Sequence, residues 1–369
     1  MMTSITIDDM EDFARGAAFL GTGGGGDPHA GRLFGESMMR RYGAPEIVAV
    51  DDVPDHAHCF TIAMMGAPTV ILEKLFNGED AELALNKLEK YLGIMADYIV
   101  PAEIGGINST LPLAVAARRG LPVVDGDGMG RAFPELQMIT YNVYGVPIAP
   151  MAIANDHMEV TIIETDDAKS AEDIGRAVAM RMGLSVMLSA YPMTGAQLKK
   201  SAVRGTMSLA LGIGRAIRKG RQAGDPVAAL LGYLRTTKYY KHCAELFDGK
   251  VVDLVRETTR GFSIGRCLFE ALDGSGRRLE VTFQNEHLIA RDDSGVRAMV
   301  PDLICMVDRE TAEPITAETL KYGQRLKVIG VSAPETMRTK EALACFGPQA
   351  FGIDEPFRPI EALIQDRSG

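Results

Sequence analysis

The sequence lacks the features that mark several large classes of protein. Its five cysteines include no closely spaced pair, which argues against both a disulfide framework and a zinc ribbon and suits a reducing cytoplasm. The N-terminal segment carries acidic residues where a secretory signal needs a basic start and an apolar run. No apolar stretch reaches the length of a membrane span. We therefore expect a cytoplasmic protein with no membrane partner.

The sequence also has fewer basic than acidic residues, with 39 lysines and arginines against 49 aspartates and glutamates, which gives a net charge of −10. Such a chain has no electrostatic footprint for a phosphate backbone, so we expect no nucleic-acid partner. Hydrophobic residues make up 46% of the sequence, which is typical of folded globular proteins. At 369 residues the chain exceeds what one core usually serves, and two domains are expected.

Motifs for covalent and metal-dependent catalysis are scarce. No serine lies in a G-x-S-x-G elbow and no cysteine lies close to a histidine in a catalytic pattern, so covalent acyl chemistry has no support. With six histidines and no histidine-rich ligand set, the sequence requires no cofactor. Its acidic loops would still permit a divalent metal ion, which could activate water.

Short apolar strands alternate with helices over the first 170 residues. Strands are predicted at 46–50, 59–65, 97–102 and 121–124, and helices at 7–19, 28–42, 78–92 and 110–118. This alternation is typical of a parallel sheet covered by helices on both faces. We predict a Rossmann-like N-terminal α/β domain over 1–170, with ligands beyond the carboxyl ends of its strands.

The pattern changes after about residue 170. Residues 171–245 are predicted to be mainly helical, with breaks at 191–195 and near 223–226. Residues 250–335 are predicted to form short strands, with a hairpin turn at 273–276. The last residues are expected to pack back onto the preceding fold. We therefore predict a C-terminal β-rich α+β domain over 171–369.

A glycine-rich turn, GTGGGGDPHAG at 21–31, has five glycines in its first six positions. Glycine lets the backbone bring its N–H groups close to a ligand. Asp27 and Pro28 predict that the turn opens onto a helix N-terminus, which favours negative charge. The turn has no Walker lysine and follows a helix rather than the strand of a dinucleotide fingerprint. The predicted substrate-binding residues, against the alternative of a plain surface loop, are Gly23, Gly24, Gly25, Gly26 and Asp27.

Two further loops follow predicted strands and carry polar side chains. In the first, EIGGINS, Glu103 supplies an acceptor and Asn108 an amide that can both donate and accept. In the second, DGDGMGRAFPE, Asp125 and Asp127 are two carboxylates that can converge on one cation or one substrate donor. A desolvated carboxylate is also a candidate general base.

Arg131 and Glu135 complete the second loop and are predicted to bind substrate or to hold the loop in place. Their spacing of four residues would equally suit an ordinary pair on a helix face.

These segments resemble the S-methyl thiohydantoin desulfurase family. The resemblance rests on residues 16–31, the EIGGINS turn, the DGDGMGRAFPE loop and a C-terminal GPQAFG at 347–352. It implies two domains and cleavage of a carbon–sulfur bond in a five-membered thiohydantoin-type ring. Members of the family are often encoded beside hydantoinase- and oxoprolinase-type enzymes.

The resemblance and the loops together suggest a hydrolytic mechanism. Water would attack the ring carbon that bears the sulfur and release a thiol, with Asp127, Asp125 or Glu103 as the base. Asn108 would bind the ring amide. Two alternatives remain open at this point, namely a nucleotide- or phosphate-binding subunit and a non-catalytic partner of a hydantoinase-type enzyme. The sequence also permits a homo-oligomer.

Overall fold

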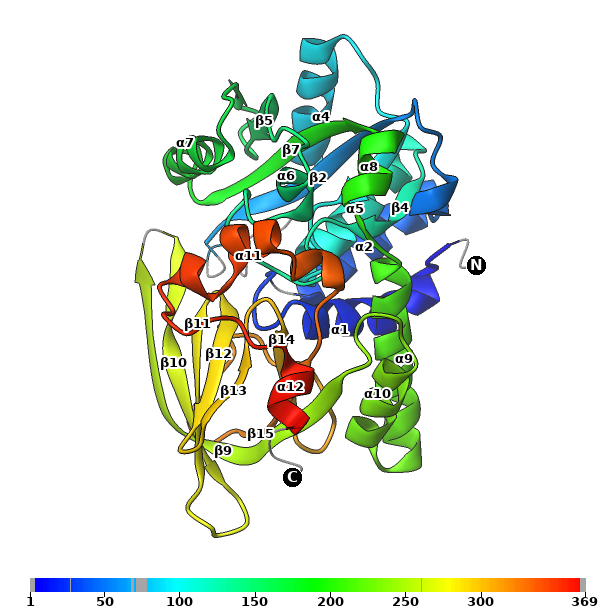
Figure 1. Ribbon diagram of the computed structural model, residues 1–369. Helices are drawn as coiled ribbons and strands as arrows, with labels where there is room; N and C mark the ends of the chain where they lie inside the picture. The colour runs from blue at the N-terminus through cyan, green and yellow to red at the C-terminus, as the bar shows by residue number, and fades with distance from the viewer. Residues whose placement is uncertain (1–3, 27, 68–69, 71–77, 260, 366–369) are drawn as a thin grey trace.

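The computed structural model describes residues 4–26, 28–67, 70, 78–259 and 261–365, and folds into two β-sheets with helices (Figure 1). Strands β1, β4, β3 and β2 of the first sheet are parallel, while β7, β5 and β6 extend it in antiparallel fashion. The order across this sheet is β1 (Ile47–Ala49), β4 (Val123–Asp127), β3 (Tyr98–Pro101), β2 (His58–Gly66), β7 (Ser185–Thr194), β5 (Met151–Ala154) and β6 (Val160–Ile163), with β8 (Val203–Arg204) beside β4.

The parallel strands are connected by helices, as the sequence predicts. Helix α4 (Glu79–Leu92) leads from β2 to β3, and α5 (Gly106–Arg119) leads from β3 to β4. Helix α5 begins at Gly106, earlier than expected, so Asn108 lies in its first turn rather than in a loop. Helix α2 (Pro28–Tyr42) has the predicted bounds and packs against α5. The Rossmann-like interpretation is therefore confirmed for this half of the sheet.

One prediction is wrong at the centre of the sheet. Residues 185–190 were expected to be helical and 191–195 to interrupt the helices, but residues 185–194 form β7, which pairs with β2 and β5. Nearly all of β7 is buried, so its side chains show no alternation of apolar and polar residues. A continuous apolar run of this kind cannot be assigned to strand or helix by periodicity. The first sheet therefore includes residues that follow the expected boundary at 170.

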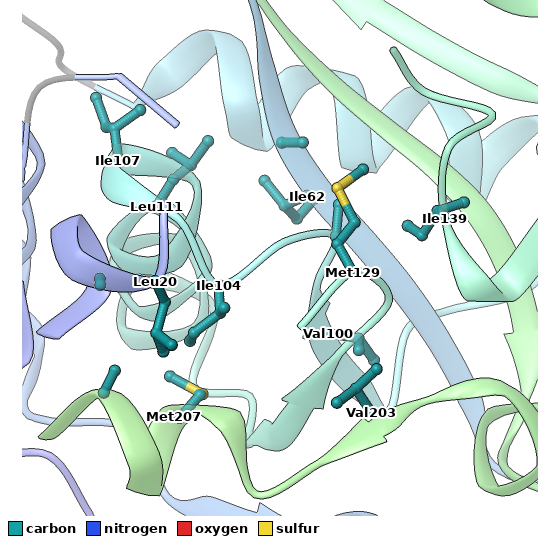
Figure 2. Close-up of a cluster of buried hydrophobic side chains, with 14 of the residues drawn as sticks. Leu20, Ile62, Val100, Ile104, Ile107, Leu111, Met129, Ile139, Val203 and Met207 are labelled. Atoms are coloured by element: carbon teal, nitrogen blue, oxygen red, sulfur yellow. The ribbon is translucent and has the colours of Figure 1, made fainter. Parts of the chain in front are cut away.

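This region also contains further helices, which lie at different places around the sheet (Figure 1). They are α1 (Met10–Leu20), α6 (Thr140–Val143), α7 (Ala168–Arg181), α8 (Gly195–Ser201), α9 (Thr206–Ala223) and α10 (Pro226–Arg235). Helix α9 packs against both α1 and α10. Figure 2 shows the core between α1, α5 and α9, where Leu20, Ile104 and Met207 are buried. Because Ile104 follows Glu103 directly, this core anchors one of the predicted site loops.

The second sheet is antiparallel throughout and lies below the first in Figure 1. Strands β12 and β14, which are not neighbours in the sheet, are in contact, so the sheet curls into a half-barrel. Its strands are β9 (Cys243–Thr259), β10 (Phe262–Ala271), β11 (Arg278–Gln284), β12 (Glu286–Asp292), β13 (Gly295–Met299), β14 (Leu303–Asp308) and β15 (Arg325–Val331). The predicted combination of an α/β and a β-rich domain is confirmed.

The C-terminal segment, residues 340–365, contacts both domains. Helix α12 (Ile360–Gln365) packs against β13 and β9, and α11 (Lys340–Phe346) packs against α6. The ring of Phe346 lies 4.8 Å from that of Phe133, which belongs to the loop after β4. Among the helices of the described residues, none has the length and apolar character needed to cross a membrane.

Candidate functional site

The glycine-rich turn lies between the two domains and is tied to both. Three backbone hydrogen bonds hold it: His287 N–H to Thr22 O (2.7 Å), Ala317 N–H to Gly23 O (2.8 Å) and Ile107 N–H to Gly25 O (2.8 Å). Two of these donors belong to the C-terminal domain and the third to α5. Asp27 lies outside the described residues. The turn is therefore a structural link between the domains rather than a plain surface loop.

Two glycines of the turn leave room for side chains from β12. A Cβ atom at Gly24 would lie 1.9 Å from Oε1 of Glu286, and one at Gly23 would lie 2.7 Å from Nε2 of His287. Gly23 also has a φ of 100°, which strongly favours glycine. Because Gly23 and Gly24 have no side chains, the carboxyl group of Glu286 and the imidazole of His287 can pack directly against the backbone of the turn.

A cavity of about 90 Å³ lies beside this turn. Its wall from the α/β domain includes Gly24, Gly25, Gly26, Ala63, Met64, Met65, Glu103, Asn108, Met129, Phe133, Glu135 and Arg176. Its wall from the C-terminal domain includes Asn285, Glu286 and Glu318. Because both domains supply side chains, the cavity exists only when the two are docked. Its size suits a small molecule.

Glu103 and Asn108 form a fixed pair on this wall. Asn108 Nδ2 donates to Glu103 Oε1 at 2.6 Å, and Asn108 Oδ1 accepts from the Met64 N–H at 2.7 Å. The other carboxyl oxygen of Glu103 is buried and has no hydrogen-bond partner among the described residues. Burial raises the pKa of Glu103 to about 8, although the bond from Asn108 opposes the rise. The structure thus brings these two predicted residues together, with one carboxyl oxygen left for a ligand.

Glu286 is a site residue that the sequence did not reveal. It is 2% exposed, at the start of β12, and its Oε2 has no partner among the described residues. Burial raises the pKa of Glu286 well above its ordinary value, and the nearby charge of Glu103 adds to the rise. Asn285 precedes it with a φ of 58°, which turns the chain between β11 and β12. Asparagine between two predicted strands signals a turn, but no local signal shows that the next side chain reaches the other domain.

Asp127 lies behind the cavity rather than on its wall. It is fully buried, and its Oδ2 accepts the N–H groups of Met129 (3.0 Å) and Gly130 (2.8 Å). Burial raises the pKa of Asp127 to about 7, against the effect of those two bonds. A charge on Asp127 in turn raises the pKa of Glu103. Asp127 is therefore placed to influence the cavity electrostatically and to hold the DGDG loop.

Asp125 faces the same way as Asp127, because alternate residues of a strand share one face. That face meets the N-terminus of α9. Asp125 Oδ1 accepts the N–H groups of Met207 and Ser208, both at 3.0 Å, and its Oδ2 accepts the Ser208 hydroxyl. Asp125 thus caps α9 from outside the helix and does not line the cavity.

Arg131 joins the two domains beneath the glycine-rich turn. Its fully buried guanidinium donates to Thr22 Oγ1 (2.8 Å), to the His287 carbonyl (3.0 Å) and to the Asp302 carbonyl (2.9 Å). Burial lowers the pKa of Arg131 to about 10, so the group still carries its charge at neutral pH. Arg131 does not line the cavity and instead holds the turn against the half-barrel.

Glu135 does line the cavity, but it is not the partner of Arg131. Its Oε2 lies 3.3 Å from Lys169 Nζ, and the segment around it is not helical. The helix-face pair that the spacing allowed is therefore absent from this loop. Within the described part of the chain, no group of three or more histidine, cysteine or acidic side chains is arranged to hold a metal ion.

Comparison with known proteins identifies the family. Two domain models match in succession, the S-Me-THD-like N-terminal domain over residues 8–165 and the S-Me-THD-like C-terminal domain over 165–360. A crystal structure of a protein from Chromobacterium violaceum is 29% identical and superposes with a TM-score of 0.81, covering 97% of this chain and 99% of that one. No curated protein matches the chain. The two matches span nearly the whole sequence, and the chain belongs to the S-Me-THD-like family.

Proposed function

We propose that the protein hydrolyses the carbon–sulfur bond of an S-methyl thiohydantoin or a closely related five-membered cyclic amide. One observation carries this proposal. Two buried carboxyl groups, Glu103 and Glu286, come from different domains and line one small cavity, and each has an oxygen without a partner among the described residues. Pairs of carboxyl groups with strongly raised pKa values are typical of acid–base catalysis. The family description supports a substrate of this class.

The reaction needs one base and one acid. In the substrate, C2 of the ring is doubly bonded to a ring nitrogen and carries the methylthio group. Glu103 accepts a proton from water as the oxygen adds to C2, and Glu286 protonates the ring nitrogen. The tetrahedral intermediate then expels methanethiolate, which takes the proton from Glu103. As the C2 hydroxyl becomes the carbonyl, its proton passes to Glu286 and restores the acid. Water thus supplies the carbonyl oxygen, one proton for the nitrogen and one for the thiol.

The two environments support this division of roles. The hydrogen bond from Asn108 favours the ionised form of Glu103, whereas burial and the nearby charge of Glu103 favour the protonated form of Glu286. We therefore assign the ionised Glu103 as the proton acceptor and the protonated Glu286 as the donor. Asn108 binds one oxygen of Glu103 and leaves the other for water. Met64 and Met129 on the same cavity wall offer soft apolar surface to the methylthio group.

The two alternatives from the sequence receive less support. The several phosphate charges of a nucleotide would meet a single cationic side chain, Arg176, among the described residues that line the cavity. A purely structural partner subunit would have no need for partnerless carboxyl groups in a cavity, since burying such groups costs stability.

The assignment is tested by the kinetics of thiol release from S-methyl thiohydantoins, with and without chelator. We expect Glu103→Gln and Glu286→Gln each to lower kcat by about 100- to 10,000-fold, because each removes one proton-transfer group. Glu341→Gln, an exposed change on α11, is the matched control and should keep wild-type turnover. Folded Glu103→Gln enzyme with near-normal kcat would rule out Glu103 as the base.

A further inference from the structure

Arg176 on α7 is the only cationic side chain among the described residues that line the cavity. It is half-buried, with 13% of its side chain exposed, whereas Glu103 and Glu286 are buried. Arg176 therefore lies on the outer side of the cavity, where a substituent of a bound ring would point.

Contacts from three segments fix the guanidinium of Arg176. Its Nε donates to Glu172 at 2.5 Å and its Nη2 donates to the Pro134 carbonyl at 3.2 Å. The ring of Phe262, from the start of β10 in the other domain, stacks on it with 4.2 Å between the ring centroid and Cζ. Glu172 also accepts the Leu136 N–H, so α7 and the loop after β4 are held together. An arginine held in this way is already oriented before any ligand arrives.

The guanidinium still has donors to offer. Arginine carries five N–H groups in a planar fork, and these contacts use two of them. A carboxylate is the anion that such a fork binds best, through two parallel hydrogen bonds.

The acids around Arg176 do not exclude an anion. Glu135 lies 3.3 Å from Lys169, which offsets its charge. Burial raises the pKa of Glu318 to about 7, which lowers its negative charge at neutral pH, and Glu103 and Glu286 lie at the more buried end of the cavity. Glu172 accepts from Nε of the guanidinium only, and no described residue accepts from the two Nη1 N–H groups, which are therefore the donors available to an anion.

We infer that Arg176 binds a carboxylate on the substituent of the substrate ring, and that Phe262 positions the guanidinium for this contact. The substrate class is then a five-membered cyclic amide with an acidic side chain rather than a neutral one. This inference rests on the part of the proposed function that names a five-membered cyclic amide as the ligand. It does not depend on the reaction proposed at C2.

Calorimetric binding of two product-like ligands tests the inference without any turnover. Hydantoin-5-acetic acid should bind the wild-type protein at least about tenfold more tightly than hydantoin-5-acetamide, a difference typical of one charge-assisted contact. Arg176→Gln should abolish that preference and Arg176→Lys should keep part of it, while Phe262→Leu should weaken it. Arg181→Gln, which removes an exposed charge from the same helix, should bind as wild type does.

Because Glu172 is buried, Arg176→Gln leaves an unpaired acid, and the double variant Arg176→Gln/Glu172→Gln controls for folding. Equal affinity for the two ligands, binding of neither, or a preference that survives in the double variant would each overturn the inference. The proposed reaction fails separately, if wild-type protein releases no thiol from either the acid or the amide form of the S-methyl substrate. Turnover of both forms with the same KM would overturn only the role of Arg176.

Discussion

At the scale of single residues, the burial of Glu103 suits a proton-transfer role and also makes the stability of the protein depend on pH. Its burial keeps a proton on the carboxyl group at a pH at which the same group in the unfolded chain is ionised. The folded pKa of about 8 stands above the ordinary value of 4.5. Its contribution to stability is therefore complete below pH 4.5 and is lost as the pH rises through 8.

This sign leads to a prediction about pH and stability. Between pH 6 and 9 the wild-type protein should lose about 3 kcal/mol of unfolding free energy through Glu103, and Glu103→Gln should not lose it. Urea unfolding at the two pH values measures the difference, with Glu341→Gln as a control that follows the wild type. Parallel losses in wild type and Glu103→Gln would show that the folded pKa of Glu103 is not raised.

The sequence identified site residues that lie close together in one loop, but it did not identify site residues that only the tertiary fold brings to the cavity. Glu103 and Asn108 were found because they follow a predicted strand in a glycine-containing loop. Glu286 and Arg176 were missed because each lies in an ordinary strand or helix, far along the sequence from the glycine-rich turn. Folding of the α/β domain brings Arg176 to the wall that carries Glu103, and only the docking of the two domains adds Glu286.

At the scale of secondary structure, the cap of α9 explains Asp125. Two backbone N–H groups at the start of this helix, those of Met207 and Ser208, are bound by the Asp125 carboxylate. A negative charge at a helix N-terminus is also favourable to the helix dipole. The carboxylate that the sequence suggested as a base is thus occupied by a structural task.

Asp125→Ala should therefore destabilise the protein by about 1–2 kcal/mol, while Asp125→Asn, which can still cap, should cost less. Denaturant unfolding measures both variants. Thiol release by the folded Asp125→Asn protein should stay within a few-fold of wild type. A loss as large as that expected for Glu103→Gln would instead favour a direct part in catalysis.

Strand β7 shows why some elements could be predicted and others not. Helix α2 was predicted with correct bounds because proline marks its start and its apolar residues recur at helical spacing. Residues 185–194 carry no such signal, since both faces of a central strand are buried and the segment is mainly apolar on both. Tertiary position decides the structure of a segment of this kind.

At the scale of the whole molecule, the cavity depends on how the half-barrel docks onto the α/β domain. Arg131 is central to that docking, because one buried guanidinium binds Thr22 of the glycine-rich turn and the carbonyls of His287 and Asp302. The sequence indicated two domains and an important loop, but it gave no means of locating their junction.

Arg131→Met should destabilise the protein by about 3–5 kcal/mol, because it leaves several buried carbonyls without a donor. Differential scanning calorimetry should show an earlier transition, and the separation of two transitions would mark uncoupled domains. Arg266→Met, on the exposed side of β10, is the control and should change stability by less than about 1 kcal/mol. An unchanged transition in Arg131→Met would contradict a central role for this residue in docking.

The central claim is hydrolysis at the ring carbon that carries sulfur, and isotope-labelled water tests it most directly. Purified protein is incubated with an S-methyl thiohydantoin in water enriched in oxygen-18, and the thiol and the ring product are quantified by mass spectrometry. We predict one methanethiol for each hydantoin formed, with a single labelled oxygen at C2, and almost no product with Glu103→Gln. Absence of thiol, or thiol release without label in the ring, would contradict the proposed function.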